Sequence, residues 1–429
     1  MMTLSRRAFL KRGGLALVTF GVAPYFLRDL AFAGDPARRK VLVCVFQRGA
    51  VDGLSQVVPF GDKDYYGARS AIALAAPSAQ PVTDPAAAPA LDLDGFFGLH
   101  PALAALHPLY KAGNVAFVHA CGSPSATRSH FDAQDFMEAG VVDNKSITSG
   151  WLNRLLVTCP EDAAKRTPFR AVSTTATLPR SLQGDHDALA IPDLRNFGVG
   201  GNARAASPTG KTAAGFEGMY DAAVGDVLGG TGKEAFDAIA MLKKINAANY
   251  QPANGAQYPG GLGRSLQQVA QLIKADLGVE IACAEVGGWD THANQGNATG
   301  QLAGRLTEFG NALAAFQRDL GDRMSDVVVL CMSEFGRTVK QNGNRGTDHG
   351  HATCFTLLGG PVRGGKVYGN WPGLAREKLY EGRDLAVTTD YRQLLAEVAQ
   401  QHFGAKQVAP IFPHFKPDPT RALGVIKKA

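Results

Sequence analysis

The sequence predicts an α/β protein in which a mostly parallel central sheet is flanked by helices. Short apolar runs of strand length occur at 40–46, 115–119, 279–286 and 327–332, and each leads into a turn with polar side chains. Between the last two runs, residues 302–320 carry apolar side chains at spacings of three and four, as one buried helical face requires. A buried strand, a helix and a second buried strand form a βαβ unit, which places the two strands parallel.

The N-terminal segment 1–33 is predicted to be an export signal. The paired arginines of SRRAFLK precede an uncharged stretch at 13–27, and the small-residue sequence AFA follows at 31–33. This pattern is typical of a secretory signal, and the paired arginines indicate the twin-arginine (Tat) export machinery. The stretch is shorter than the ~20 apolar residues that a membrane-spanning helix needs. We therefore expect a periplasmic or secreted protein, 34–429 after cleavage, without a transmembrane segment.

Composition indicates one large globular domain over 34–429. The chain has a net charge of +6; five basic residues and one aspartate give the signal +4, which leaves +2 for the rest. This charge is too small to indicate a nucleic-acid partner. Two further helices are expected at 232–250 and 264–277, and the alanine- and proline-rich stretch 71–91 is expected to be a loop. A glycine- and proline-rich insertion is expected at 185–212.

Candidate ligands follow the first and third strands, at the edge where parallel sheets hold their ligands. Asp52 follows the first strand in the turn QRGAVDG. Asp290 and His292 follow the third strand in GGWDTH, and such a pair offers the oxygen and nitrogen ligands that zinc accepts. The alternative is structural, because an aspartate before a glycine is often a turn residue. Asp290 would then cap a turn, and His292 would be solvated.

The fourth strand leads to the densest group of candidate ligands. It ends at Glu334, and the following loop carries Asp348, His349 and His351 in the sequence GTDHGH. Gly350 permits an unusual backbone angle between the two histidines. A solvated loop is the alternative, but it would not require these side chains directly before another apolar strand.

Ser129 is the best candidate for a nucleophile, because it follows the second strand at the start of an expected helix. Thr127 and Ser125 compete for this role, and Arg128 could bind an oxyanion with two hydrogen bonds. Ser129 also fits a helix N-cap, with Asp132 three residues later. The two roles are compatible, because a helix N-terminus stabilises a developing anion.

Five ordered motifs, QRGAVDGLS, SHFDAQDFMEAG, GWDTHANQ, SEFGRT and GTDHGH, resemble an exported bacterial family called domain of unknown function 1501. This family is placed in the alkaline phosphatase and sulfatase superfamily, and the resemblance covers nearly all of residues 40–400. It implies an alkaline-phosphatase-like sandwich that hydrolyses a small anionic ester of phosphate, or a related sulfate or phosphonate ester. It also implies two divalent metal ions, with zinc expected first and manganese, calcium or magnesium as alternatives.

By position in the motifs, the resemblance implies that Asp52 and the Ser129 hydroxyl bind one metal, and that Asp290 and His292 bind the other. The remaining ligands stay open. Either Glu334 replaces a strand-end aspartate and a histidine of the GTDHGH loop is the distant ligand, or the Asp-His pair of that loop acts directly.

The charge of the transferred group would be neutralised by arginines, namely Arg128 with Arg48 or Arg337. Formylglycine chemistry is not expected, because the proline after Cys121 is one residue out of register with the sulfatase motif. The alternative function is a catalytically inactive, metal-stabilised periplasmic protein of the same fold that acts in binding or assembly.

Overall fold

The computed structural model describes residues 38–78, 83–161, 166–194 and 249–428. The expected signal and nearly all of the expected helix at 232–250 lie outside these residues. The same is true of most of the expected insertion at 185–212.

Strand β1 (Val41–Gln47) lies inside the central sheet and is buried along its whole length. It pairs in parallel with β8 (Ile281–Val286) on one side and β9 (Val327–Met332) on the other. Helix α11 (Gln301–Leu320) lies between β8 and β9 in the chain, which confirms the expected βαβ unit.

The central sheet is mostly parallel. Among the described residues, only β10 (Thr353–Leu358) runs antiparallel to its neighbours, which are β9 and β5 (Val115–Gly122). The order is β11 (Lys366–Tyr368), β5, β10, β9, β1, β8, β6 (Ala171–Ser173) and β7 (Leu189–Ala190), with β12 (Thr389–Asp390) beside β5. A small second sheet contains β2 (Val57–Val58), β4 (Gly98–Leu99) and β3 (Leu91–Asp92).

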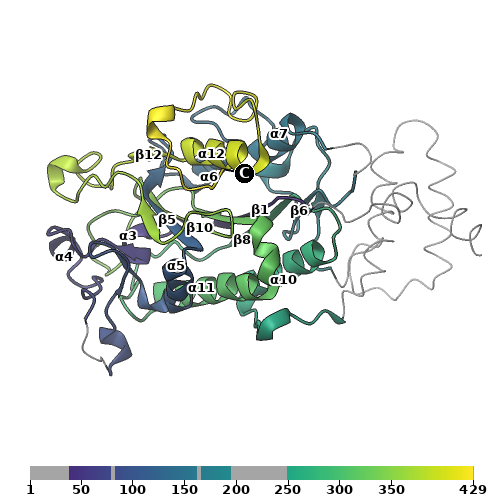
Figure 1. Cartoon of the computed structure of the whole chain (residues 1–429). Helices are drawn as coiled ribbons and strands as arrows, with labels where there is room; N and C mark the ends of the chain where they lie inside the picture. The colour runs from purple at the N-terminus through teal and green to yellow at the C-terminus, as the bar shows by residue number, and fades with distance from the viewer. Residues whose placement is uncertain (1–37, 79–82, 162–165, 195–248, 429) are drawn as a thin grey trace, which may run out of the picture.

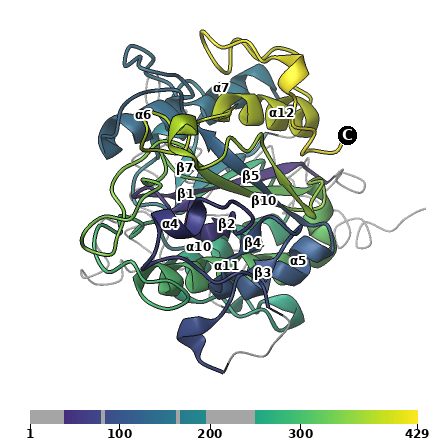
Figure 2. The same ribbon diagram turned by 90° about the vertical axis from the view of Figure 1, so that its left-hand side faces the viewer.

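Helices cover both faces of the central sheet (Figures 1 and 2). One face holds α5 (His107–Lys111), α10 (Gly260–Lys274) and α11, and the other holds α6 (His130–Ala139), α7 (Trp151–Thr158) and α12 (Tyr391–Phe403). Successive side chains of β1 enter opposite cores, because a strand alternates its faces. The result is a three-layer α/β arrangement.

Short helices complete the connections. Two α-helical turns follow β1 and β2, at α3 (Gly53–Gln56) and α4 (Tyr65–Ala68). Within the described ranges, 3₁₀ segments occur at Pro85–Ala87, Pro101–Leu106, Arg180–Leu182, Ala253–Gly255, Gly321–Asp326, Arg376–Lys378 and Pro419–Arg421. The stretch 71–91 is otherwise irregular where it is described, as expected.

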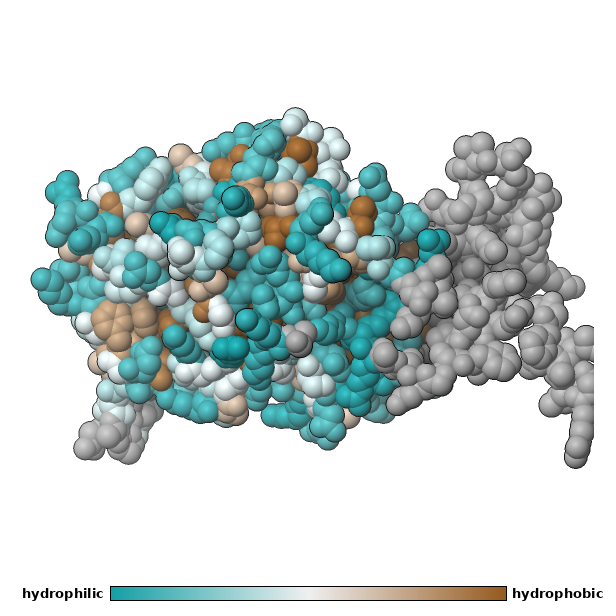
Figure 3. Space-filling model, turned by 45° about the horizontal axis from the view of Figure 1, so that its top comes forward, coloured by the Kyte–Doolittle hydropathy of each residue, from teal (hydrophilic) through white to brown (hydrophobic). Residues whose placement is uncertain are grey.

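On the face shown in Figure 3, hydrophilic residues dominate and hydrophobic ones are scattered. In the part of the chain that the structure describes, no helix combines the length and the apolar character needed to span a membrane.

Candidate metal centre

Histidines and carboxylates from distant parts of the chain meet beyond the carboxyl ends of β8 and β9. Asp290 and His292 lie in the loop after β8, and His349 lies in the loop between β9 and β10. His130 is the first residue of α6, and Glu334 follows β9. The edge of the sheet that the sequence predicts for the site is therefore the edge at which these side chains gather.

Two glycines let the loop between β9 and β10 lie against its neighbours. A Cβ added at Gly346 would lie 2.3 Å from the carbonyl carbon of His292, and one added at Gly350 would lie 2.4 Å from that of Arg337. At Gly350 it is the close approach of two backbones that requires glycine, since the φ of this residue is not positive. An isolated antiparallel bridge between Arg337 and His349 holds the loop in place.

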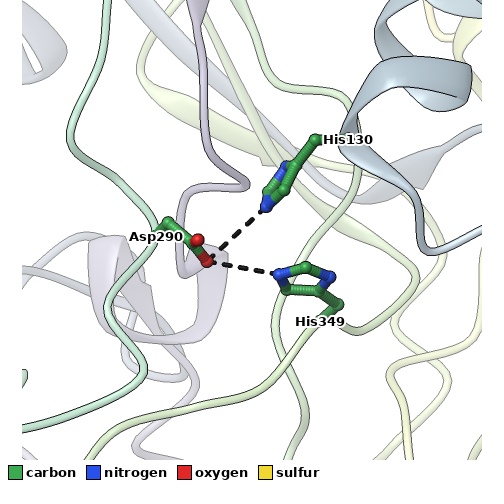
Figure 4. A group of neighbouring side chains, drawn as sticks. All are labelled: His130, Asp290 and His349. Carbon is green, nitrogen blue, oxygen red and sulfur yellow. Dashed lines mark hydrogen bonds and ion pairs between the residues drawn. The ribbon is translucent and has the colours of Figure 1, made fainter.

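The cluster is centred on one oxygen of Asp290. Its Oδ1 lies 2.9 Å from Nε2 of His292 and 3.3 Å from Nε2 of His349, and these two nitrogens are 3.1 Å apart. Nε2 of His130 lies 3.6 Å from the same oxygen. Figure 4 shows the rings of His130 and His349 directed at the carboxylate. Imidazole nitrogens from three segments thus converge on one carboxylate oxygen.

The other ring nitrogen of each histidine is held from outside the cluster. Nδ1 of His130 lies 2.8 Å from Oε1 of Glu334, and Nδ1 of His292 lies 2.9 Å from Oδ1 of Asp348. Nδ1 of His349 lies 2.8 Å from the backbone oxygen of Arg128. These partners only accept hydrogen bonds, so each neutral ring carries its proton on Nδ1 and turns the Nε2 lone pair toward Asp290. Metal-ligating histidines are held in this way by carboxylates and carbonyls.

This donor set fits a divalent cation. Lone pairs of nitrogen and oxygen that face one another at these distances repel unless a proton or a cation lies between them, and Nε2 of His130 is buried without a hydrogen-bond partner. Ligands about 2.0–2.1 Å from a tetrahedral zinc ion stand roughly 3.3 Å apart. Ligand atoms of His130, Asp290 and His349 lie within 4.8 Å of one another.

Protein charges keep the carboxylates ionised. Burial raises the pKa of Asp290, but Arg337, His292 and His130 together lower it below its usual value. Burial also raises the pKa of Glu334, but hydrogen bonds from His130, Gln134 and backbone N–H groups together lower it below its usual value. The hydrogen bond from His292 holds the pKa of Asp348 below its usual range.

The surroundings of the histidines differ from one ring to the next. The hydrogen bond to Glu334 raises the pKa of His130. Burial, in contrast, lowers the pKa of His349 and favours its neutral form, which is the form that binds metal.

The expected anion-binding arginines all form ion pairs with carboxylates. Arg337 is fully buried, donates to Oδ1 of Asp290 at 2.5 Å, and also donates to backbone oxygens of the loops after β1 and β8. Arg128 pairs with Asp384 and Glu381. Arg48 pairs with Glu138 and Glu285.

The structure places Asp52 and His351 outside the cluster. Asp52 is buried, and Arg69 donates to both of its oxygens, at 2.6 and 3.0 Å, while Ser55 and Gln295 donate to Oδ2. The ring of His351 stacks on Tyr380 with 4.2 Å between centroids.

Glu334 and Asp348 contact the cluster indirectly, through the Nδ1 atoms of His130 and His292. Ser129 caps α6 with a long contact of 3.5 Å between its Oγ and the backbone nitrogen of Asp132. Sequence analysis missed His130, although it stands beside Ser129 in the motif SHFD. The other two hydroxyl candidates make contacts of their own: Ser125 donates to Asp143, and Thr127 accepts from the N–H of Ser129.

The fold and this cluster define an α/β protein with a histidine-rich candidate metal centre at the carboxyl edge of its parallel strands. The chain belongs to the family described as a protein of unknown function (DUF1501), whose family model matches residues 39–411. No curated protein matches the chain.

Proposed function

We propose that this protein is an exported, metal-dependent hydrolase of phosphate or related esters, with one divalent ion held by the residues His130, Asp290, His292 and His349. One observation supports the metal above all others. The Nε2 atoms of the histidines converge on one oxygen of Asp290, while each Nδ1 is fixed from outside. Export through the twin-arginine pathway, which carries folded proteins, would suit a chain that takes up its metal in the cytoplasm.

The charges around the cluster favour one ion over the two that the family resemblance implies. Asp290, Glu334 and Asp348 contribute three negative charges, and Arg337 contributes one positive charge. The remaining charge of −2 is neutralised by one divalent cation. Asp52, the expected ligand of a second ion, already has Arg69 as its counter-charge. The nitrogen-rich donor set favours zinc over calcium or magnesium, which prefer oxygen ligands.

Hydrolysis needs a nucleophile beside the metal, and we propose the hydroxyl of Ser129. The backbone oxygen of Arg128 holds His349, and the ring of His130 faces Asp290, so both residues that flank Ser129 contact the cluster. A divalent ion supplies Lewis acidity and lowers the pKa of a hydroxyl that it contacts. We also propose that the chain is a member of the alkaline phosphatase and sulfatase superfamily.

A second candidate is a metal-stabilised binding or assembly protein without catalytic activity. The ion pairs of Arg48, Arg128 and Arg337 favour it, because an anionic group at the metal would have to compete with a carboxylate for each of these arginines.

Elemental analysis of protein purified without chelator, followed by assays on phosphomonoesters, phosphodiesters and sulfate esters, tests both candidates. One zinc ion per chain with ester turnover supports the hydrolase, and one ion without turnover supports the second candidate. Replacing Asp290 or His292 by alanine is expected to remove the metal and the turnover. His107→Ala is the control, because Nε2 of His107 bonds the backbone oxygen of Asp92, which is not part of the cluster. Protein without metal, or full metal content in both cluster variants, contradicts the assignment.

A further inference from the structure

We propose that Gln295 is a positioning residue for this metal centre. Its buried amide joins the two loops that carry Asp290, His292 and His349, and anchors both to the ion pair of Asp52 with Arg69. The inference rests on the metal centre proposed above and adds a role for residues that do not contact the metal.

The amide oxygen of Gln295 connects the two loops. It accepts hydrogen bonds from the hydroxyls of Thr291 at 2.7 Å and Thr347 at 2.8 Å, so both of its lone pairs are occupied. Thr291 stands between Asp290 and His292, and Thr347 is two residues before His349. The backbone N–H of Thr347 also donates to the oxygen of Thr291 at 3.1 Å. The amide therefore helps to set the spacing between the two ligand-bearing segments, beside direct hydrogen bonds from the N–H groups of Asn294 and Gln295 to the backbone oxygens of Asn344 and Arg345.

Holding the threonines inward turns their neighbours outward. Thr291 is 3% exposed, whereas the side chains of Asp290 and His292 on either side of it are both 44% exposed. Thr347 is fully buried, whereas the side chain of Asp348 is 53% exposed. The burial of Thr291 thus alternates with the exposure of the two ligands beside it, and the burial of Thr347 with the exposure of Asp348, whose carboxylate holds Nδ1 of His292. The two buried hydroxyls therefore fix the side of the chain on which Asp290, His292 and Asp348 are exposed.

The ion pair determines the orientation of the amide. The Nε2 group of Gln295 donates to Oδ2 of Asp52 at 2.7 Å, and a flipped amide would place its oxygen against that carboxylate. Burial opposes the charge of Asp52, but the charge and hydrogen bonds of Arg69, together with hydrogen bonds from Ser55 and Gln295, lower its pKa below the usual value, so the carboxylate stays an acceptor. Arg69 also donates to the backbone oxygens of Thr338 and Val339.

The network also contacts the loop that carries His349. The hydroxyl of Thr338 accepts from the N–H of Asp348 at 3.1 Å. In a buried network whose members are all hydrogen-bonded, each bond restricts the others and one arrangement is favoured. The aspartate that follows β1 thus acts on the metal through Gln295 and the two threonines.

The test compares Gln295→Met with Gln393→Met in the full chain. Gln393 is also buried and joins two segments through both ends of its amide, but these are α12 and the segment around Asp418. Zinc affinity is measured by competition with a chelating dye, and the geometry of the site by the visible spectrum of the cobalt(II) form. We expect Gln295→Met to weaken zinc binding about 10- to 100-fold and to change the cobalt spectrum. Gln393→Met should leave both unchanged.

A milder pair of variants covers the case in which Gln295→Met does not fold. Thr347→Val removes one hydroxyl that bonds Gln295, and Thr356→Val removes a buried hydroxyl that bonds Gln56 inside the sheet. Weaker zinc binding and an altered spectrum for Thr347→Val alone support the proposal. Wild-type affinity and spectrum in both Gln295→Met and Thr347→Val overturn it while leaving the metal centre intact. A wild-type protein that binds neither ion contradicts the metal centre, and the positioning role with it.

Discussion

Asp52 and Asp290 follow neighbouring parallel strands, β1 and β8, yet their surroundings differ. Both oxygens of Asp52 accept from Arg69, and Ser55 and Gln295 add further donors, so its charge is balanced inside the protein. Asp290 has one arginine partner, and the same oxygen faces imidazole nitrogens whose protons lie on the far side of each ring. Position at the edge of the sheet is common to both. The groups that face the remaining lone pairs distinguish a structural carboxylate from a candidate ligand.

The largest expected effect is the loss of stability in Asp52→Asn. Asp52→Asn leaves Arg69 buried without the counter-charge of Asp52, which is expected to cost about 3–5 kcal/mol of stability. Because the pKa of Asp52 is lowered in the folded state, its contribution is present above the unfolded value of about 3.9 and is lost as the pH falls through the folded value. Urea unfolding of both proteins from pH 7 to pH 3 should therefore show a difference that shrinks below about pH 4.

The matched control for this measurement is Asp64→Asn. Asp64 precedes α4, but its side chain makes no capping hydrogen bond, so the change is expected to stay within about 0.5 kcal/mol. A small effect for Asp52→Asn, or one of equal size at every pH, would show that the ion pair does not have the assigned role.

The next effect separates the two histidines of the GTDHGH loop. His349→Ala removes a nitrogen that lies 3.3 Å from Asp290, and we expect zinc binding to weaken by more than the roughly 100-fold that loss of an outer partner can cause. His351→Ala removes a ring stacked on Tyr380 and is expected to retain zinc. Titration with a competing chelator measures both. Equal losses in the two variants would mean that the distinction between them is wrong.

Much of the fold could be predicted because its central strands are continuous apolar runs, as fully buried strands are. The outer strands β6, β7, β11 and β12 are two or three residues long and show no periodicity. The location of the site at the strand ends was also predictable, since parallel strands bring their carboxyl ends to one edge.

Roles within the site were harder to predict, because they depend on partners that are remote in the sequence. His130 stands beside a helix cap and gains its role from Glu334, 204 residues away. Asp52 matched a ligand pattern, but its partner Arg69 lies in a segment without a recognisable motif. Local spacing indicates which residue types are present, whereas the direction of each lone pair depends on tertiary contacts.

Glu334 is a carboxylate that acts on the cluster through a histidine. Oε1 of Glu334 accepts from Nδ1 of His130, from Gln134 and from the N–H of Gly49, each at 2.8 Å. Glu334→Gln keeps the size but removes the charge that fixes the ring, so we expect zinc affinity to fall about 10- to 100-fold. Chelator competition measures the loss. An affinity that falls as far as in His349→Ala would instead indicate that Glu334 is itself a ligand.

The smallest expected change in stability is that of Ser129→Ala. The capping contact of Ser129 is long, at 3.5 Å, so the cost is expected near the lower end of the ~0.5–2 kcal/mol range for N-caps. Zinc should stay bound, because the four proposed ligands, His130, Asp290, His292 and His349, are all retained. If Ser129 is the nucleophile, ester turnover is lost while stability and zinc are nearly retained, and Thr127→Val keeps its turnover. Retained turnover in Ser129→Ala would restrict the hydroxyl to capping α6 and would require another nucleophile at the metal.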